Sequence, residues 1–176
     1  MIQFVTFRLA DSLPAAVAER LATEMAEHQE RRDPIDPETE WEDALDAGHG
    51  SCLLRDPGCA SIVEGSLRHH DGSTYALHAW CVMPNHVHVL LATLAERRLP
   101  EVLRSIKRFT AGAINTHLGR TGGVWRRDYF DRFIRDDAHY RATVAYIHRN
   151  PVAAGLVSSP EQWPHSSAGR WDVRHG

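Results

Sequence analysis

The chain has 176 residues, little cysteine and no long apolar run. The three cysteines, Cys52, Cys59 and Cys81, are odd in number and form no Cys-x-x-Cys pair, which argues against a disulfide framework and a zinc knuckle. We therefore expect them to be reduced core residues. No stretch approaches the roughly 18 consecutive apolar residues of a membrane helix, and residues 1–14 lack the basic start and apolar run of a signal peptide. These absences predict a cytoplasmic protein with no membrane partner.

Lysine is also nearly absent, because Lys107 is the single lysine among 20 basic residues. Arginine's planar fork suits phosphate contacts. The charge is unevenly distributed: residues 1–66 carry 5 Lys+Arg and 14 Asp+Glu, a net charge of −9, whereas residues 67–176 carry 15 and 9, a net charge of +6. Blocks of opposite sign indicate a basic working surface with an acidic appendage.

Hydrophobic periodicity predicts an α+β fold. Alternating or apolar runs predict strands at 2–9, 74–83, 86–92 and 124–135. Apolar residues at helical spacing predict helices at 59–70, 100–118 and 138–149, the last terminated by Pro151. This order favours a ferredoxin-like βαββαβ antiparallel sheet with helices on one side. We expect a single domain over 1–167, an acidic helical insertion at 10–50 and a C-terminal tail at 168–176.

Two histidines on the third predicted strand indicate half of a metal site. Residues two apart on a strand point to the same face, so His86 and His88 would stand side by side, with Val87 and Val89 on the other face. Neutral imidazole is the commonest metal ligand in proteins. A satisfied, half-buried pair of histidines remains the alternative interpretation of the strand alone.

The last predicted helix offers the other half. Tyr146 falls on the opposite side of the helical wheel from the apolar positions, and Asn150 lies one turn beyond it on the same face. An amide oxygen suits hard divalent cations. Taken alone, Tyr146 could be a packing residue and Asn150 a helix-ending residue before proline. The apolar positions of this helix are Tyr140, Val144, Ile147 and Pro151.

These motifs occur in a fixed order along the chain. They are Met83-Pro84-Asn85-His86-Val87-His88, Lys107-Arg108-Phe109-Thr110, Gly123-Val124-Trp125, Tyr129-Phe130-Asp131, Ile134-Arg135-Asp136, Tyr146-Ile147-His148-Arg149-Asn150-Pro151 and Trp163-Pro164-His165-Ser166-Ser167. The set resembles the REP-associated tyrosine transposases, relatives of the insertion-sequence single-strand transposases. Those are HUH (His-hydrophobe-His) endonucleases with one catalytic tyrosine. The resemblance covers about 2–9 and 52–167, and the acidic segment 10–50 is not required by the core fold.

The resemblance implies a specific activity. It implies cleavage of single-stranded DNA beside a hairpin, of the REP or insertion-sequence-end type, with Mg²⁺ or Mn²⁺ as cofactor. His86, His88 and Asn150 match the metal ligands, and Tyr146 matches the nucleophile that forms a 5′-phosphotyrosine and allows strands to be rejoined. Such a transposase would act as a monomer or homodimer in association with the nucleoid.

The DNA-contacting residues are expected among arginines and aromatics of the basic half. Arginine pairs with backbone phosphate, and aromatic rings can stack on unpaired bases, although an aromatic residue such as Trp125 is more often a core residue. The candidates are Lys107, Arg108, Trp125, Arg126, Arg127, Arg132 and Arg149. Two alternative functions remain. One is a domesticated, catalytically silent hairpin-binding or regulatory protein, and the other is a replication initiator or relaxase, which shares the histidine pair.

Overall fold

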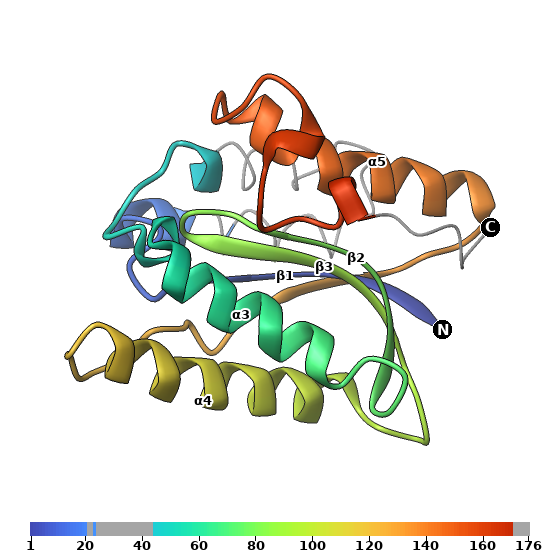
Figure 1. The fold of residues 1–176 in the computed structure, drawn as a ribbon, viewed down its shortest axis with the longest axis horizontal. Coiled ribbons are helices and arrows are strands. Elements are labelled where there is room, and N and C mark those ends of the chain that lie inside the picture. Colours follow the sequence, from blue (N-terminus) through green and yellow to red (C-terminus); the bar gives the residue numbers. More distant parts are fainter. Residues whose placement is uncertain (21–22, 24–43, 171–176) are drawn as a thin grey trace.

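The computed structural model describes residues 1–20, 23 and 44–170. Within them, four strands form one antiparallel sheet in the order β2-β3-β1-β4 (Figure 1). The strands are β1 (Ile2–Arg8), β2 (Tyr75–Val82), β3 (His86–Thr93) and β4 (Phe130–Phe133). The longer helices are α3 (Pro57–His69), α4 (Leu99–His117) and α5 (Asp137–Ala153), and short 3-10 helices occupy Leu53–Arg55, Pro160–Gln162 and Ala168–Arg170. The predicted α+β class and the predicted βαββαβ order of elements are confirmed.

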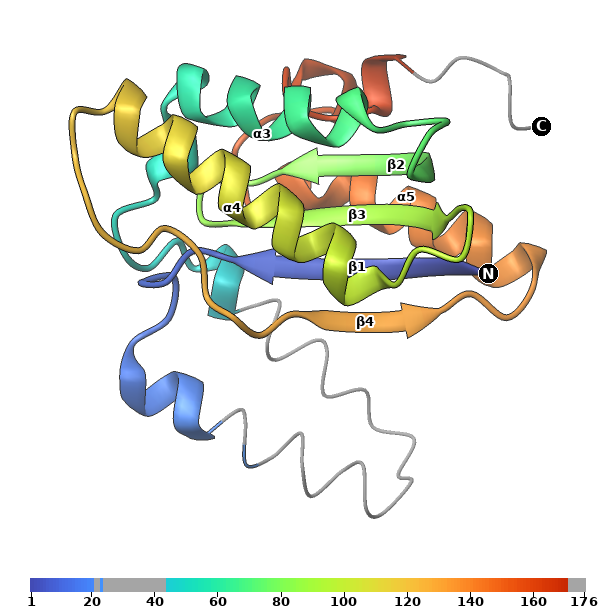
Figure 2. The ribbon, with the colours of Figure 1, turned by 90° about the horizontal axis from the view of Figure 1, so that it is seen from below.

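The helices cover both faces of the sheet, not one. Helices α3 and α4 lie side by side on one face, and α5 crosses the other (Figures 1 and 2). The expectation of helices on one side therefore holds for α3 and α4 but not for α5. The reason lies in the central strands, which are apolar on both faces: Val89 of β3 is buried toward α4, and Leu90 is buried toward α5. A strand with two apolar faces needs a covering layer on each.

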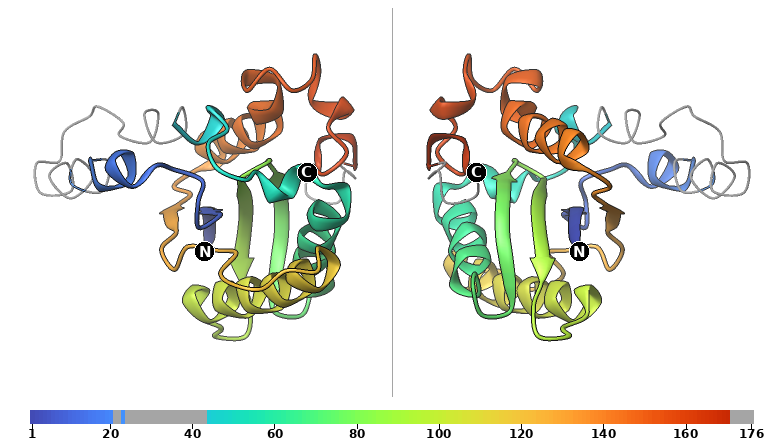
Figure 3. Two further views of the ribbon diagram at one scale, coloured as in Figure 1. Left: turned by 90° about the vertical axis from the view of Figure 1, so that its left-hand side faces the viewer. Right: turned by 90° about the vertical axis from the view of Figure 1, so that its right-hand side faces the viewer.

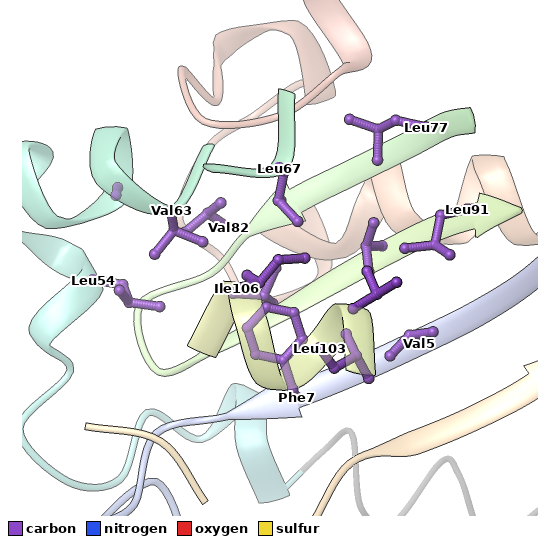
Figure 4. Packing of buried hydrophobic residues seen from close by; sticks show 14 of the residues in the cluster. Val5, Phe7, Leu54, Val63, Leu67, Leu77, Val82, Leu91, Leu103 and Ile106 are labelled. Atoms are coloured by element: carbon purple, nitrogen blue, oxygen red, sulfur yellow. The ribbon is translucent and has the colours of Figure 1, made fainter. Parts of the chain in front are cut away.

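The larger hydrophobic core lies between the sheet and the α3–α4 pair (Figure 4). Phe7 of β1 and Leu91 of β3 meet Leu103 and Ile106 of α4 there, all of them buried. The core toward α5 is smaller and is built around Phe4, Leu90 and related residues. Most of the apolar burial that stabilises the fold is therefore on the α3–α4 face.

Two predicted boundaries differ from the structure. The ribbon expected over 124–135 is a strand only at β4, because Trp125 turns inward against Phe7, with ring centroids 5.0 Å apart, and forms an isolated bridge with Leu9. Helix α5 continues past Pro151 to Ala153, although termination at Pro151 was expected. Pro151 lacks a donor, but its own carbonyl still accepts from the Leu156 N–H, so the last turn is retained.

Several expectations concern regions that the structure describes only in part. The predicted insertion at 10–50 lies mostly outside the described residues, although Leu13 and Leu45 at its two ends are buried in one small cluster. The expected tail is described only as far as Arg170. All three cysteines are free and buried, as expected. No helix in the described ranges is both long and apolar enough to span a membrane.

Candidate metal and nucleophile site

The two histidines of β3 lie on the face that α5 covers. His88 is paired across the sheet with Thr6 of β1, and both imidazoles are almost completely buried. The intervening Val87 and the following Val89 point into the core on the opposite face. The predicted arrangement of side chains along this strand is therefore present, and β3 supplies a core on one side and imidazoles on the other.

Asn85 fixes the proton position on His86. Its Nδ2 donates to the carbonyl oxygens of Leu45 and His49, at 3.0 and 3.3 Å, so the opposite end of the amide is its carbonyl oxygen. That oxygen, Oδ1, lies 2.8 Å from Nδ1 of His86 and can only accept. Nδ1 of His86 therefore carries the hydrogen, and Nε2 of the neutral ring carries the lone pair.

His88 faces that lone pair. Its Nε2 lies 3.1 Å from Nε2 of His86, and its Nδ1 lies 2.8 Å from the hydroxyl of Thr6. A hydroxyl can donate or accept, so Thr6 supports either tautomer of His88. With the hydrogen on Nδ1, both Nε2 lone pairs converge on one point, which is the arrangement that a cation stabilises.

Helix α5 brings Tyr146 and Asn150 to the same place. The Tyr146 ring lies edge-on to His88 and Phe4, with centroids 5.4 and 5.9 Å away. The expectation that Tyr146 lies opposite the apolar positions is wrong. The buried face of α5 is broad and includes Asn150 as well as Ile147. Tyr146 therefore lies at the edge of this buried face and not on the solvent-facing side of the helix.

Asn150 connects the nucleophile candidate with the histidines. Its Nδ2 donates to the Tyr146 hydroxyl oxygen at 3.0 Å. Its Oδ1 is buried, and no donor in the described part of the chain lies at hydrogen-bonding distance and angle to it. A buried carbonyl oxygen without a donor is costly. A cation held together with the two imidazoles would satisfy it.

Burial keeps both histidines neutral. It lowers the pKa of His86 to about 3, and interaction with the Asn150 side chain opposes this shift only in part. Burial also lowers the pKa of His88 well below its ordinary value, with a further lowering from neighbouring His86. At neutral pH the two rings therefore present lone pairs and not charges. Two imidazole nitrogens and one amide oxygen fit a divalent cation such as Mg²⁺ or Mn²⁺.

The sequence alone assigns no role to several residues that shape this site. Asn85 lies within the Met-Pro-Asn-His motif, so the motif itself was its signal. Thr6 gave no signal, because its place beside His88 depends on the pairing of β1 with β3. Asp46, whose Oδ1 lies 3.8 Å from Nε2 of His86, gave no signal either, because it falls in the segment 10–50, which was expected to be an insertion.

Most of the predicted DNA-contacting residues lie away from this site. Five of the seven line one groove of about 630 Å³ between α4 and the segment 122–129, on the α3–α4 side of the sheet. They are Lys107, Arg108, Trp125, Arg126 and Arg127. We call this groove the basic groove; Arg104 and Tyr129 also line it. Arg132 is paired with Phe4 on the face toward α5, and Arg149 is exposed on α5.

Two residues of the basic groove also hold it together. The Lys107 ammonium donates to the carbonyl oxygens of Arg126, Arg127 and Asp128. Burial lowers the pKa of Lys107 to about 8. The Trp125 indole donates to Thr110, as the core interpretation of this residue expected. Both side chains therefore fix the shape of the groove, whatever they contact within it.

A second group of metal-ligating side chains is explained by helix capping. Asp56, Cys59 and His117 place one ligand atom each within 4.8 Å of one another. Asp56 caps α3 by accepting from the Cys59 N–H, and its Oδ1 lies 2.9 Å from Nε2 of His117. Burial raises the pKa of the Cys59 thiol to about 11, which disfavours the thiolate that binds metals.

Comparisons with known proteins agree with these features. A Haemophilus influenzae protein, provisionally named a REP-associated tyrosine transposase, is 29% identical over 130 residues, covering 65% of this chain and 68% of that protein. A solved structure described as a REP-associated tyrosine transposase bound to a REP hairpin matches with a TM-score of 0.59 at 19% identity, covering 96% of this chain and 77% of that chain. At this identity the structural likeness shows the fold alone. The model of the family described as "Transposase IS200 like" matches residues 62–150, half of the chain, and the chain belongs to that family.

Proposed function

We propose that this transposase is a metal-dependent, single-strand DNA endonuclease and strand transferase. It cleaves near a DNA hairpin through a 5′-phosphotyrosine on Tyr146 and can rejoin the cut strand. The observation that supports this most directly is that the side chains of Tyr146, His88 and Asn150 lie together. The Tyr146 ring contacts His88, and the Tyr146 hydroxyl accepts from Asn150, on the same face of the sheet.

His86, His88 and Asn150 are the proposed holders of Mg²⁺ or Mn²⁺. When bound, the cation polarises the scissile phosphodiester and stabilises charge on its oxygens. The protein's part is to keep the two neutral imidazoles oriented toward one point, which Asn85 and Thr6 do through their hydrogen bonds to the rings. Residues that orient ligand rings in this way influence metal affinity strongly.

Tyr146 is the proposed nucleophile. Its Oη forms a bond to phosphorus while the bond from phosphorus to the leaving 3′ oxygen breaks, and the phenolic proton is lost as a 3′-OH is released. A free tyrosine has a pKa near 10. The Nδ2 of Asn150 donates to the Tyr146 oxygen and so helps to hold that oxygen in place. Asn150 thus serves the tyrosine with one end of its amide and the cation with the other.

The proposed DNA partner is a hairpin with an adjoining single strand. The basic groove offers four arginine side chains, Arg104, Arg108, Arg126 and Arg127, for backbone phosphates. The transposase of similar fold is described as bound to a REP hairpin, which supports this choice for the present chain. The Tyr146 helix lies over the histidines of its own chain, so the site needs no second copy to bring the tyrosine near. We place this activity in the cytoplasm, at the nucleoid.

A covalent-adduct assay tests the proposal. The protein is incubated with Mn²⁺ and hairpin DNA that carries a 3′-terminal label downstream of the cleavage point, and products are separated under denaturing conditions. The wild-type chain should retain the label as a protein adduct. Tyr146→Phe should bind the hairpin with unchanged affinity and form no adduct.

The matched control is Tyr140→Phe, which removes a hydroxyl from the same helix near His78. It should form the adduct at the wild-type level. Cleavage by Tyr146→Phe at the parental rate would exclude the assignment of the nucleophile. A wild-type protein that binds the hairpin but never forms an adduct would favour the silent hairpin-binding alternative.

A further inference from the structure

The described segment 44–50 carries the chain back from the acidic insertion to the sheet, beside the histidines. Leu45 is fully buried, and its carbonyl oxygen accepts from Asn85, as does the carbonyl oxygen of His49. Asp46 lies between these two anchored residues. The same Asn85 amide that orients the His86 ring therefore also sets the position of the backbone that carries Asp46.

The Asp46 carboxylate is close to the lone pair of His86. Its Oδ1 lies 3.8 Å from Nε2 of His86, the nitrogen without a hydrogen, and its side chain is only 19% exposed. Asp46 and His86 line one small cavity of about 20 Å³, which Ala154 and Leu156 at the end of α5 also line. A cavity of this size admits a single small group.

The charge of the proposed ligand set leaves room for an acidic group. His86, His88 and Asn150 are all neutral, so a divalent cation bound by them alone would keep its full charge in a buried site, which is costly. Carboxylate oxygen is a preferred ligand of Mg²⁺ and Mn²⁺. We propose that Asp46 is the acidic member of this cation site and binds the cation directly or through one water.

This inference rests on the proposed function and gives the insertion a role in it. The core fold does not require the segment that carries Asp46, yet the segment supplies the carboxylate nearest to Nε2 of His86 among the described residues. The carboxylate tightens cation binding before DNA arrives. It also lowers the net charge that the cation presents to the scissile phosphate. The site would therefore hold the cation more tightly but polarise the phosphate less strongly.

A purely structural role for Asp46 makes a different prediction. Arg55 lines the same cavity as Asp46. In a purely structural role, the Asp46 carboxylate would use this positive neighbour to hold the segment 44–50 in place. Its removal would then lower the thermal midpoint of unfolding without changing cation affinity. Cation affinity and thermal stability therefore have to be measured on the same protein samples.

The experiment is a calorimetric titration of the full, EDTA-treated chain with MnCl₂ in the absence of DNA. Asp46→Asn should weaken Mn²⁺ binding by at least about tenfold, whereas Asp46→Glu, which keeps the charge, should retain most of the affinity. The control is Glu101→Gln, an exposed carboxylate in the first turn of α4, which should bind as the wild type does. The unfolding midpoint of each protein is measured in parallel.

Two outcomes overturn the inference, and they can be told apart. If Asp46→Asn binds Mn²⁺ as tightly as a wild-type protein that forms the DNA adduct, Asp46 is no ligand and the proposed function still stands. If the wild-type protein binds no Mn²⁺ and forms no adduct, both proposals fail. Should Asp46→Asn not fold, Asp46→Ser takes its place, and wild-type affinity in that variant overturns the inference equally.

Discussion

The two faces of the sheet are built for different purposes from the same strands. The face toward α3 and α4 carries the larger apolar core and, beside it, the basic groove. Figure 3 shows α4 (yellow) and α5 (orange) on opposite sides of the strands. The face toward α5 carries the histidines, Thr6 and Asn150 with a smaller apolar cluster around them. Alternation along β3 makes this division possible, because adjacent residues serve opposite faces. Stability can then come mainly from one face and chemistry from the other.

The sharpest test uses neighbours on β3. His88→Ala should lower the rate of adduct formation by about 10²–10³-fold, the range seen when one charge-stabilising group is removed from an active site. Hairpin affinity should stay within about twofold of the wild type, because the basic groove lies on the other face. Adduct rates and filter-binding affinities measured on one preparation check both statements. A comparable loss of hairpin affinity would break the separation of faces.

The adjacent Val89→Ala should show the opposite behaviour. Val89 is fully buried in the larger core, so its truncation should lower the free energy of unfolding by about 2 kcal/mol. The rate of adduct formation by the folded protein should be unchanged. Urea denaturation gives the first quantity, and the adduct assay at low temperature gives the second. A rate defect as large as that of His88→Ala would show that the two faces are coupled.

Replacing two arginines of the basic groove should weaken DNA binding moderately. Arg126→Ala combined with Arg127→Ala should lower hairpin affinity by about tenfold near 0.1 M salt and reduce the salt dependence by about two phosphate contacts. Once DNA is saturating, the rate of adduct formation should return to the wild-type level. The control pair is Arg135→Ala with Arg141→Ala, exposed arginines that do not line the basic groove.

The smallest effect concerns pH. Burial lowers the pKa of Lys107 to about 8, so this side chain loses its positive charge as pH rises through 8, while the arginines keep theirs. Hairpin affinity should therefore fall a few-fold between pH 7 and 9. Lys107→Arg should lose this dependence, because arginine stays protonated throughout. Equal pH profiles for the two proteins would mean that the Lys107 charge does not reach the DNA.

Local pattern was sufficient for most of the elements and for the two histidines of the proposed ligand set. Alternating or apolar runs located β1, β2 and β3, and helical spacing located α3 and α4. His86 and His88 follow from spacing on a strand, whereas Tyr146 and Asn150 also needed the resemblance. Local sequence pattern does not specify the contacts between residues that are far apart in the chain. The pairing of β1 with β3 puts Thr6 beside His88, and the packing of α5 decides which face covers the imidazoles.

The arginines illustrate the same limit. Their number and clustering predicted a basic surface, but charge does not specify on which face of a sheet a residue will lie. The inward turn of Trp125 onto Phe7 places Arg126 and Arg127 beside α4, while Arg132, a few residues later on β4, lies on the other face. A short irregular segment thus divides one predicted DNA-contacting set between two surfaces.

The Asn85 side chain joins the segment 44–50 to the His86 ring, so removing that segment would change the site. Both hydrogens of its Nδ2 are donated to carbonyl oxygens of the segment 44–50, while its Oδ1 holds the His86 ring. Deleting that segment would leave two buried donors unsatisfied and free the amide to rotate, with the imidazole following it. The geometry of the His86 side chain is thereby coupled to the segment 44–50. Shortening it in this chain would disturb the site before it disturbed the sheet.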